Sequence, residues 1–240
     1  MRTVDRLNKD WLLATEIHKL ETRLWRQAQK SQLRVVLLTS AVRGEGKSTT
    51  TAYLATALGM YPNRKVLAVD LDFREPRLNS HFQVDVPHGF GEVLRGKCPL
   101  QNAIIKTELP SLDLILPAIS DDSNLLLKTQ QFADIFVVLR ERYDLILLDV
   151  PALLPVADAS MLLPLADAVI LVTMAGKTTK PQLRRAREIC AGMEANILGI
   201  VVGNLKEAMP GYGDSSYYYS YQKEGRPERG GADSKAEPKK

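Results

Sequence analysis

The sequence predicts an α/β protein in which a mostly parallel β-sheet has helices on both faces and is followed by a flexible C-terminal tail. Short apolar runs typical of buried parallel strands recur along the chain, and helical patterns alternate with them. After Lys206 the apolar periodicity ends. A chain of 240 residues with 45% hydrophobic residues can bury one large core, so we expect one folded domain.

The expected elements follow in order along the chain. An amphipathic helix over residues 10–30 comes first, because its apolar side chains recur at helical spacing. Strands are expected at residues 33–39, 66–69, 112–116, 144–148, 168–172 and 196–202. Helices are expected at residues 48–60, 91–95, 124–142, 157–163 and 180–193. Such alternation indicates right-handed crossovers, and ligands bind beyond the carboxyl ends of the strands.

Three parts of the chain are expected: a helical segment over residues 1–31, the α/β domain over 32–206 and a tail over 207–240. The tail is rich in Pro, Gly, Ser and alternating charges, a composition typical of disorder. Five of the eight tyrosines of the chain nevertheless gather in it, namely Tyr212, Tyr217, Tyr218, Tyr219 and Tyr221. A packed strand or a sticky surface patch would also explain such a cluster.

Composition argues against several other classes of protein. Cys98 and Cys190 lie far apart and outside any CxxC or Cys/His ligand spacing, so neither a disulfide framework nor a zinc site is indicated, and a reducing cytoplasm fits. No apolar run approaches the roughly 18 residues that a membrane-spanning helix needs, and no signal peptide is evident. If the protein works at a membrane, we expect another molecule to hold it there.

The positive charge is concentrated near the N-terminus. Residues 1–34 carry eight Lys or Arg and four acidic residues. This imbalance suits a solvated helix face, or contact with an anionic membrane surface or an acidic partner. The basic residues are not interleaved with aromatic ones, so nucleic acid is not an expected partner.

A glycine-rich turn follows the first expected strand and precedes a helix. Its residues are Ser40, Ala41, Val42, Arg43, Gly44, Glu45, Gly46, Lys47, Ser48 and Thr49. Such a turn cradles phosphates with its backbone amides, the lysine reaches the β- and γ-phosphates, and the serine hydroxyl ligates Mg²⁺. A strict Walker A motif has glycine where this chain has Ala41, which indicates a subfamily. The fold is therefore expected to be P-loop NTPase-like.

Carboxylates follow two further strands. Asp70 and Asp72 come just after the second strand, where one carboxylate can hold Mg²⁺ and the other can accept a proton from a hydroxyl. A plain surface turn is the alternative explanation for this pair. Asp149 ends an apolar strand, as a Walker B motif requires. Together with Lys47 these carboxylates are the expected catalytic residues, and the expected metal ligands are Ser48, Asp70 and Asp149.

These motifs resemble those of the bacterial tyrosine kinases, the cytoplasmic kinases of capsule and exopolysaccharide assembly, whose P-loop core is close to the MinD/ParA ATPases. The resemblance spans about residues 12–221. It is carried by the turn at Gly44 to Ser48, by Asp70 to Arg74 as a Walker A′ motif, by Asp149-Val150-Pro151 and by the tyrosine cluster. It implies an ATP- and Mg²⁺-dependent protein-tyrosine autokinase that phosphorylates its own tail and regulates the polymerisation and export of the polysaccharide.

The resemblance also implies roles for single residues. ATP would be held by Arg43, Gly44, Glu45, Gly46, Lys47, Ser48 and Thr49, with Asn204 near the adenine. Ser48, Asp70 and Asp149 would arrange Mg²⁺ directly or through water, and either Asp70 or Asp72 would receive the tyrosine proton. The phosphate acceptors would be Tyr212, Tyr217, Tyr218, Tyr219 and Tyr221.

A partner on a separate chain is also implied. Because no membrane-spanning segment is evident, a membrane protein of the polysaccharide co-polymerase type would anchor and activate the kinase at the inner face of the cell membrane. Self-association is expected as well. The family's helical motif Glu-x-x-Arg-x-x-Arg is matched only loosely by Glu16 and Lys19, whereas Thr22 does not match and Arg23 is one position late.

Two other functions are compatible with a P-loop. A MinD/ParA-type switch ATPase would use ATP without phosphorylating protein, but Val42 stands where such proteins have a signature lysine. An interaction module with degenerate catalysis would have lost catalytic residues, whereas Lys47, Ser48, Asp70, Asp72 and Asp149 are all present. Both observations favour the kinase.

Overall fold

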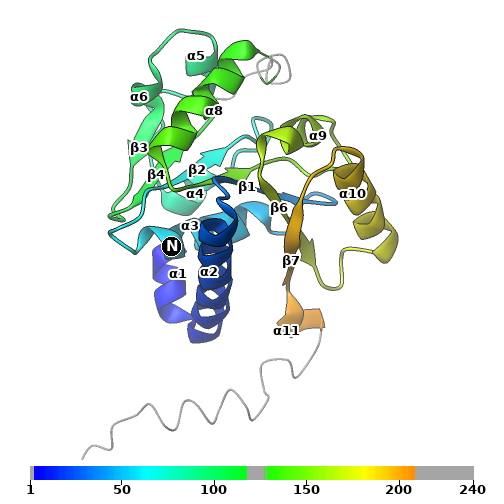
Figure 1. The fold of residues 1–240 in the computed structure, drawn as a ribbon. Coiled ribbons are helices and arrows are strands. Elements are labelled where there is room, and N and C mark those ends of the chain that lie inside the picture. Colours follow the sequence, from blue (N-terminus) through cyan, green and yellow to red (C-terminus); the bar gives the residue numbers. More distant parts are fainter. Residues whose placement is uncertain (1–2, 118–126, 128, 209–240) are drawn as a thin grey trace, which may run out of the picture. The chain divides into compact units, whose positions relative to one another are not determined.

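The computed structural model describes residues 3–117, 127 and 129–208. Its centre is a seven-stranded sheet with the order β3-β4-β2-β5-β1-β6-β7 (Figure 1). The strands are β1 (Val35–Ser40), β2 (Val66–Asp70), β3 (Ile104–Lys106), β4 (Leu112–Ile115), β5 (Leu145–Asp149), β6 (Ala168–Met174) and β7 (Ile197–Gly203). Every neighbouring pair is parallel except β3 and β4, so the predicted mostly parallel α/β fold is confirmed.

The central strands are apolar up to their carboxyl ends, where polar or charged residues follow, because helices cover both faces of the sheet. Alternate residues of each strand belong to two separate hydrophobic clusters. One cluster packs under α2 (Trp11–Ser31) and α3 (Lys47–Gly59), and the other under α8 (Gln130–Arg142) and α10 (Lys180–Gly192). A strand with a period of two therefore buries both sets of its side chains, which explains the continuous apolar runs.

All six expected strands are present, with bounds shifted by one or two residues. Strand β3 was not expected, because it has three partly exposed residues and is held only by its antiparallel pairing with β4. The short helices α4 (Leu78–Phe82) and α6 (Leu100–Ala103) were also not expected, nor were the 3₁₀ turn η1 (Leu163–Leu165) and α11 (Leu205–Ala208). Helix α1 (Thr3–Lys9) lies within the helical segment expected over residues 1–31 but before the helix expected over residues 10–30. Helices α5 (Phe90–Leu94) and α9 (Asp158–Leu162) match expected ones.

Helix α8 begins at Gln130, and Thr129 caps it by accepting a hydrogen bond from the amide of Phe132. The expected helix began earlier, at residue 124, but residues 124–126 and 128 lie outside the described residues.

The N-terminal helices pack on α3. Asp10 separates α1 from α2 and caps α2 by accepting a hydrogen bond from the amide of Leu13. On the inner face of α2, buried Glu21 forms an ion pair with Arg64, whose guanidinium lies 4.1 Å from the ring centroid of Trp25 and 3.9 Å from that of Tyr61. This buried pair joins α2 to the loop before β2. Among the described helices, none has the length and apolar content to cross a bilayer.

The chain divides into two units, Met1–Asn204 and Leu205–Lys240, and α11 belongs to the second. In the first unit, β1 lies between β5 and β6, and β5 lies between β1 and β2. Parallel strands end at the same edge of a sheet. This order therefore brings together the segments that follow β1, β2 and β5.

Candidate nucleotide and metal site

The turn between β1 and α3 contains two glycines in the left-handed backbone region. Gly44 has a φ of 73° and Gly46 a φ of 86°. Only glycine adopts such angles without strain. A Cβ atom on Gly44 would also lie 2.6 Å from Nζ of Lys177, so a side chain here would displace this ammonium. The turn leads directly into α3, which begins at Lys47, so the start of a helix faces the expected phosphates.

A second loop, between β6 and α10, holds this turn in place. Lys177 donates a hydrogen bond of 3.0 Å to the carbonyl oxygen of Gly44. The carboxylate of Glu45 is buried, and it accepts hydrogen bonds from the hydroxyl of Thr178 and from the amide of Val42, the latter at 2.8 Å. The side chain of Glu45 therefore supports the turn, and only its backbone is available for a phosphate.

Two other residues expected to hold the nucleotide lie at the rim of the turn. The side chain of Arg43 forms an exposed ion pair with Glu75 at 2.9 Å. The hydroxyl of Thr49 lies 3.5 Å from Nε2 of His81. As with Glu45, these side chains have protein partners, so a phosphate contact from this part of the chain would come from its backbone amides.

Asp70 and Asp149 are opposite each other in the register of β2 and β5, and both are fully buried. Asp70 accepts backbone hydrogen bonds from Asp72 at 3.0 Å, Arg77 at 3.0 Å and Leu78 at 3.1 Å. It therefore shapes the whole segment between β2 and α4. Neither oxygen of the Asp149 side chain has a hydrogen-bond partner among the described residues.

Asp72 lies closest to the lysine of the turn. Its Oδ2 atom is 3.0 Å from Nζ of Lys47, and its Oδ1 accepts a hydrogen bond of 3.1 Å from the amide of Glu75. A small cleft of about 30 Å³ beside this pair is lined by Arg43, Gly44, Lys47, Asp72, Arg74, Glu75, Pro151, Ala152, Pro155 and Val156. The Lys47–Asp72 ion pair thus borders this cleft.

Burial is the largest influence on the pKa values of Asp149, Asp70 and Lys47. It raises the pKa of Asp149, and the neighbouring charge of Asp70 raises it further, while Lys47 and Ser48 lower it only in part. Burial also raises the pKa of Asp70, against the backbone hydrogen bonds that lower it. Burial lowers the pKa of Lys47, but Asp149, Asp72 and Asp70 outweigh this effect and raise it overall, so the ammonium stays charged.

A divalent cation fits this arrangement. The buried carboxylate of Asp149 has no partner at hydrogen-bond distance in the part of the chain that the structure describes, Asp70 lies beside it, and the Ser48 hydroxyl is near enough to stabilise its charged form. A buried carboxylate pair with one lysine nearby lacks positive charge, and oxygen ligands of this kind suit Mg²⁺. The residues expected to bind the metal are therefore brought together.

Asn204 and the tyrosines are not part of this group. Asn204 directly follows β7 and has a left-handed φ of 62°, and its Nδ2 donates a hydrogen bond of 3.4 Å to the carbonyl oxygen of Ala175. It is thus tied to the loop that also carries Lys177 and Thr178. Tyr212, Tyr217, Tyr218, Tyr219 and Tyr221 lie outside the described residues.

The support that Lys177 and Thr178 give to the turn was not predicted from the sequence. A signal existed, because Gly176-Lys177-Thr178 directly follows a buried strand, at the edge where ligands bind in such sheets. The hydrogen bonds that Asp70 accepts at the start of α4 were not predicted either, because their donors, the amides of Arg77 and Leu78, lie seven and eight positions after Asp70 in the chain.

The fold and the turn define a P-loop NTPase of the MinD/ParA-like group, and the profile of the AAA domain family matches residues 33–181. The chain is 28% identical to a structure of the septum site-determining protein MinD of Pyrococcus horikoshii complexed with Mg-ADP, with a TM-score of 0.62, covering 70% of this chain and 69% of that one.

Tyrosine kinases match a larger share of the chain. Tyrosine-protein kinase YwqD of Bacillus subtilis is 30% identical over 176 residues, which are 73% of this chain and 74% of the relative. The crystal structure of the VpsO kinase domain is 27% identical with a TM-score of 0.74, covering 82% of this chain and 98% of that one. The chain belongs to the bacterial tyrosine kinase family, and it is a protein-tyrosine kinase.

Proposed function

We propose that this kinase transfers the γ-phosphoryl group of ATP, with Mg²⁺, to the tyrosines of its own C-terminal cluster. The observation that carries the proposal is the group of charges at the edge of the sheet. The Lys47–Asp72 ion pair borders a small cleft, and the carboxylate of Asp149, which interacts with Lys47, has no hydrogen-bond partner among the described residues. A bound cation would neutralise the carboxylate of Asp149, and the phosphates of ATP would pair with the ammonium of Lys47.

The turn and Lys47 would hold the nucleotide. Backbone amides from Gly44 to Thr49 and the start of α3 suit the phosphate oxygens, and Lys47 would neutralise charge on the β- and γ-phosphates. Ser48, Asp70 and Asp149 would hold Mg²⁺, directly or through water. When bound, the ion neutralises charge that develops on the phosphate oxygens.

The hydrogen bonds support Asp72 rather than Asp70 as the group that receives the tyrosine proton. Both oxygens of Asp70 already accept backbone hydrogen bonds inside the protein. Asp72 instead lines the cleft, and one of its oxygens accepts a hydrogen bond from Lys47. When Lys47 moves toward a phosphate, this oxygen becomes available. The tyrosine oxygen would then attack the γ-phosphorus, its proton would pass to Asp72, and the bond to the β–γ bridging oxygen would break to release ADP.

The tail can supply the acceptors. Tyr217 is thirteen residues from Asn204, a reach of at most about 45 Å at about 3.4 Å per residue. Each phosphate adds about −1.5 to −2 charges, so a modified tail would be repelled by an acidic site. Adjacent tyrosines would let one tail take several phosphates.

We further propose that phosphorylation regulates the polymerisation and export of a capsular or exopolysaccharide at the inner face of the cell membrane. A membrane co-polymerase on a separate chain would anchor and activate the kinase. The basic residues of the N-terminal helices, among them Arg23, Arg26 and Lys30 on exposed positions of α2, are the candidate contact for an acidic partner or an anionic surface.

The test uses the purified full chain with ATP and Mg²⁺, alone and with a cytoplasmic fragment of a co-polymerase, followed by mass spectrometry of the C-terminal peptide. We expect phosphotyrosine in the peptide that contains residues 211–221. Lys47→Met should abolish it without changing the melting temperature greatly, while Lys65→Met, at an exposed position outside the site, should not. Wild-type protein that hydrolyses ATP but carries no phosphotyrosine with the activating fragment present would overturn the proposal and indicate a switch ATPase.

A variant in which five tyrosines are replaced together by Phe tests whether they are the acceptors while leaving the nucleotide site unchanged. The replaced residues are Tyr212, Tyr217, Tyr218, Tyr219 and Tyr221. The variant should bind ATP as the wild type does and should still phosphorylate a kinase-inactive Lys47→Met chain. If the phosphate remains on the variant itself, the acceptors lie elsewhere in the chain.

A further inference from the structure

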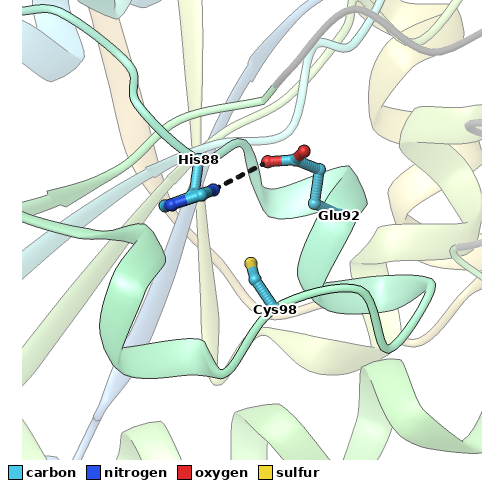
Figure 2. Close-up of side chains that lie close together, drawn as sticks. All are labelled: His88, Glu92 and Cys98. Carbon is cyan, nitrogen blue, oxygen red and sulfur yellow. Dashed lines mark ion pairs between the residues drawn. The ribbon is translucent and has the colours of Figure 1, made fainter.

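A second group of side chains, with donor atoms unlike those of the nucleotide site, converges around helix α5. His88 precedes the helix, Glu92 lies in its first turn, and Cys98 follows it (Figure 2). One nitrogen, one oxygen and one sulfur atom from these residues lie within 4.8 Å of one another. Nδ1 of His88 is 3.4 Å from Oε2 of Glu92. Figure 2 shows all three side chains directed toward a common space.

We propose that His88, Glu92 and Cys98 form a binding site for a divalent transition metal, for which zinc is the best match. Imidazole nitrogen, carboxylate oxygen and thiolate sulfur are the three ligand types that zinc takes from proteins, whereas Mg²⁺ and Ca²⁺ prefer oxygen alone. In a tetrahedral zinc site the ligand atoms lie about 3.3–3.8 Å apart, as follows from bond lengths of about 2.0–2.3 Å. Small rotations of the three side chains would close the observed distances to this range.

The backbone around this site is well fixed. The amide of Phe90 donates a hydrogen bond of 2.8 Å to the carbonyl oxygen of Leu116, at the end of β4, and the side chain of Phe90 is fully buried. After α5 the chain reverses at Gly96, which has a left-handed φ of 67°, and the amide of Lys97 bonds back to the carbonyl oxygen of Glu92 at 2.9 Å. This reversal places Cys98 opposite the start of the helix. The backbone that carries the three proposed ligands is therefore held in place by hydrogen bonds and packing within the protein.

Capping of the helix explains only part of the arrangement. Glu92 accepts a hydrogen bond of 3.1 Å from the amide of Gly89, as an acidic residue in the first turn commonly does. Neither helix capping nor the contact between His88 and Glu92 explains why the thiol of Cys98 lies close to these two side chains. Burial and the charge of Glu92 raise the pKa of the Cys98 thiol, so an incoming metal would have to displace its proton.

Three protein ligands leave a fourth position of a tetrahedral ion open. In zinc proteins this position holds water or a ligand from another molecule. The site lies at the end of β4, which neighbours β2 and its Asp70, so an ion here would stiffen a segment next to the nucleotide site without sharing a ligand with it. The proposal is independent of the function proposed above.

The test is a titration of the purified, reduced full chain with Co²⁺, in excess Mg²⁺ that fills oxygen-ligand sites. Cobalt bound to a thiolate gives a sulfur-to-metal charge-transfer band in the near ultraviolet, and oxygen ligands do not. We expect one such cobalt per chain, displaced by Zn²⁺. His88→Ala and Glu92→Gln should each weaken binding by at least about tenfold.

The chain provides a matched control, because it has two cysteines. Cys98→Ser should remove the band, whereas Cys190→Ala, at a buried position on α10, should keep it. Circular dichroism checks that each variant is folded, and Cys98→Ala repeats the measurement if the serine variant is not. Absence of the band in the wild type, or a band that persists without Cys98, would overturn the proposal.

Discussion

Asp70 and Asp149 face each other in register on the neighbouring parallel strands β2 and β5, and both are fully buried. Asp70 is satisfied by three backbone amides, but Asp149 has no hydrogen-bond partner among the described residues. The same sheet edge thus carries one carboxylate that organises the backbone and one that is left for a ligand. Predictions about stability and activity follow from this difference.

Asp149→Asn should stabilise the nucleotide-free protein while impairing function. The buried carboxyl must either keep its charge away from water or take up a proton, and an amide avoids both costs, so we expect a gain of about 1–2 kcal/mol in the free energy of unfolding. Thermal unfolding without nucleotide and calorimetric titration with Mg²⁺ and ATP would measure both effects. Asp134→Asn, at an exposed position of α8, serves as the control and should change neither. A less stable Asp149→Asn variant would contradict the prediction.

The effect of Asp149→Asn on the free energy of unfolding should also depend on pH. The pKa of Asp149 is raised in the folded protein above its ordinary value of 3.8, first by burial. The folded state therefore binds the proton more tightly than the unfolded state, and this stabilising contribution is complete below the ordinary pKa and lost as the pH rises through the folded-state pKa. Relative to the wild type, Asp149→Asn should gain stability progressively as the pH rises. Denaturant unfolding across pH would check this, and a difference independent of pH would exclude it.

Glu45 should matter for nucleotide affinity although its side chain points into the protein. Glu45→Ala would leave the amide of Val42 and the hydroxyl of Thr178 without their shared acceptor, at a cost of about 1–3 kcal/mol. We expect the KM for ATP to rise roughly tenfold, since the turn loses its support. Glu75→Ala removes only the exposed pair with Arg43 and should have little effect on KM. Equal effects of the two variants would show that the buried bonds do not position the turn.

The ion pair between Glu21 and Arg64 should be important for stability. Glu21→Ala would leave the guanidinium of Arg64 partly buried without its carboxylate, which typically costs about 3–5 kcal/mol. Glu16→Ala, on the same helix, removes an exposed pair with Lys19 and should cost less than about 1 kcal/mol. Denaturant unfolding of both variants compares the two pairs directly. A loss for Glu21→Ala no larger than that for Glu16→Ala would mean that α2 is held by its apolar face alone.

Arg64 also shows why charge alone does not describe this contact. Its guanidinium stacks on Trp25 and Tyr61, which a lysine ammonium cannot reproduce. We expect Arg64→Lys to lose a substantial part of the stability that Glu21→Ala loses. A double-mutant cycle between the two positions measures the share that belongs to the ion pair.

Local sequence was enough to predict the main strands, the glycine-rich turn and the carboxylates that follow β2 and β5. Strands buried on both faces must be apolar throughout, and a phosphate-binding turn needs its glycines and lysine at fixed spacing, so both leave a local pattern. Strand β3 and helix α4 leave no such pattern. The first exists because β4 offers it hydrogen bonds, and the second begins where Asp70 accepts the amides of Arg77 and Leu78.

The sequence by itself determined the class of fold, the kinase motifs and the set of candidate residues. Only the tertiary structure decided how these residues divide their tasks: Asp70 holds the backbone, Asp72 pairs with Lys47, and Asp149 has no hydrogen-bond partner among the residues described. It also brought Thr178 to Glu45 across 133 positions and Cys98 to His88 around the turn at Gly96. The physical reason is that a motif depends on neighbours along the chain, whereas hydrogen bonding and burial depend on strand order and register, which bring distant segments together.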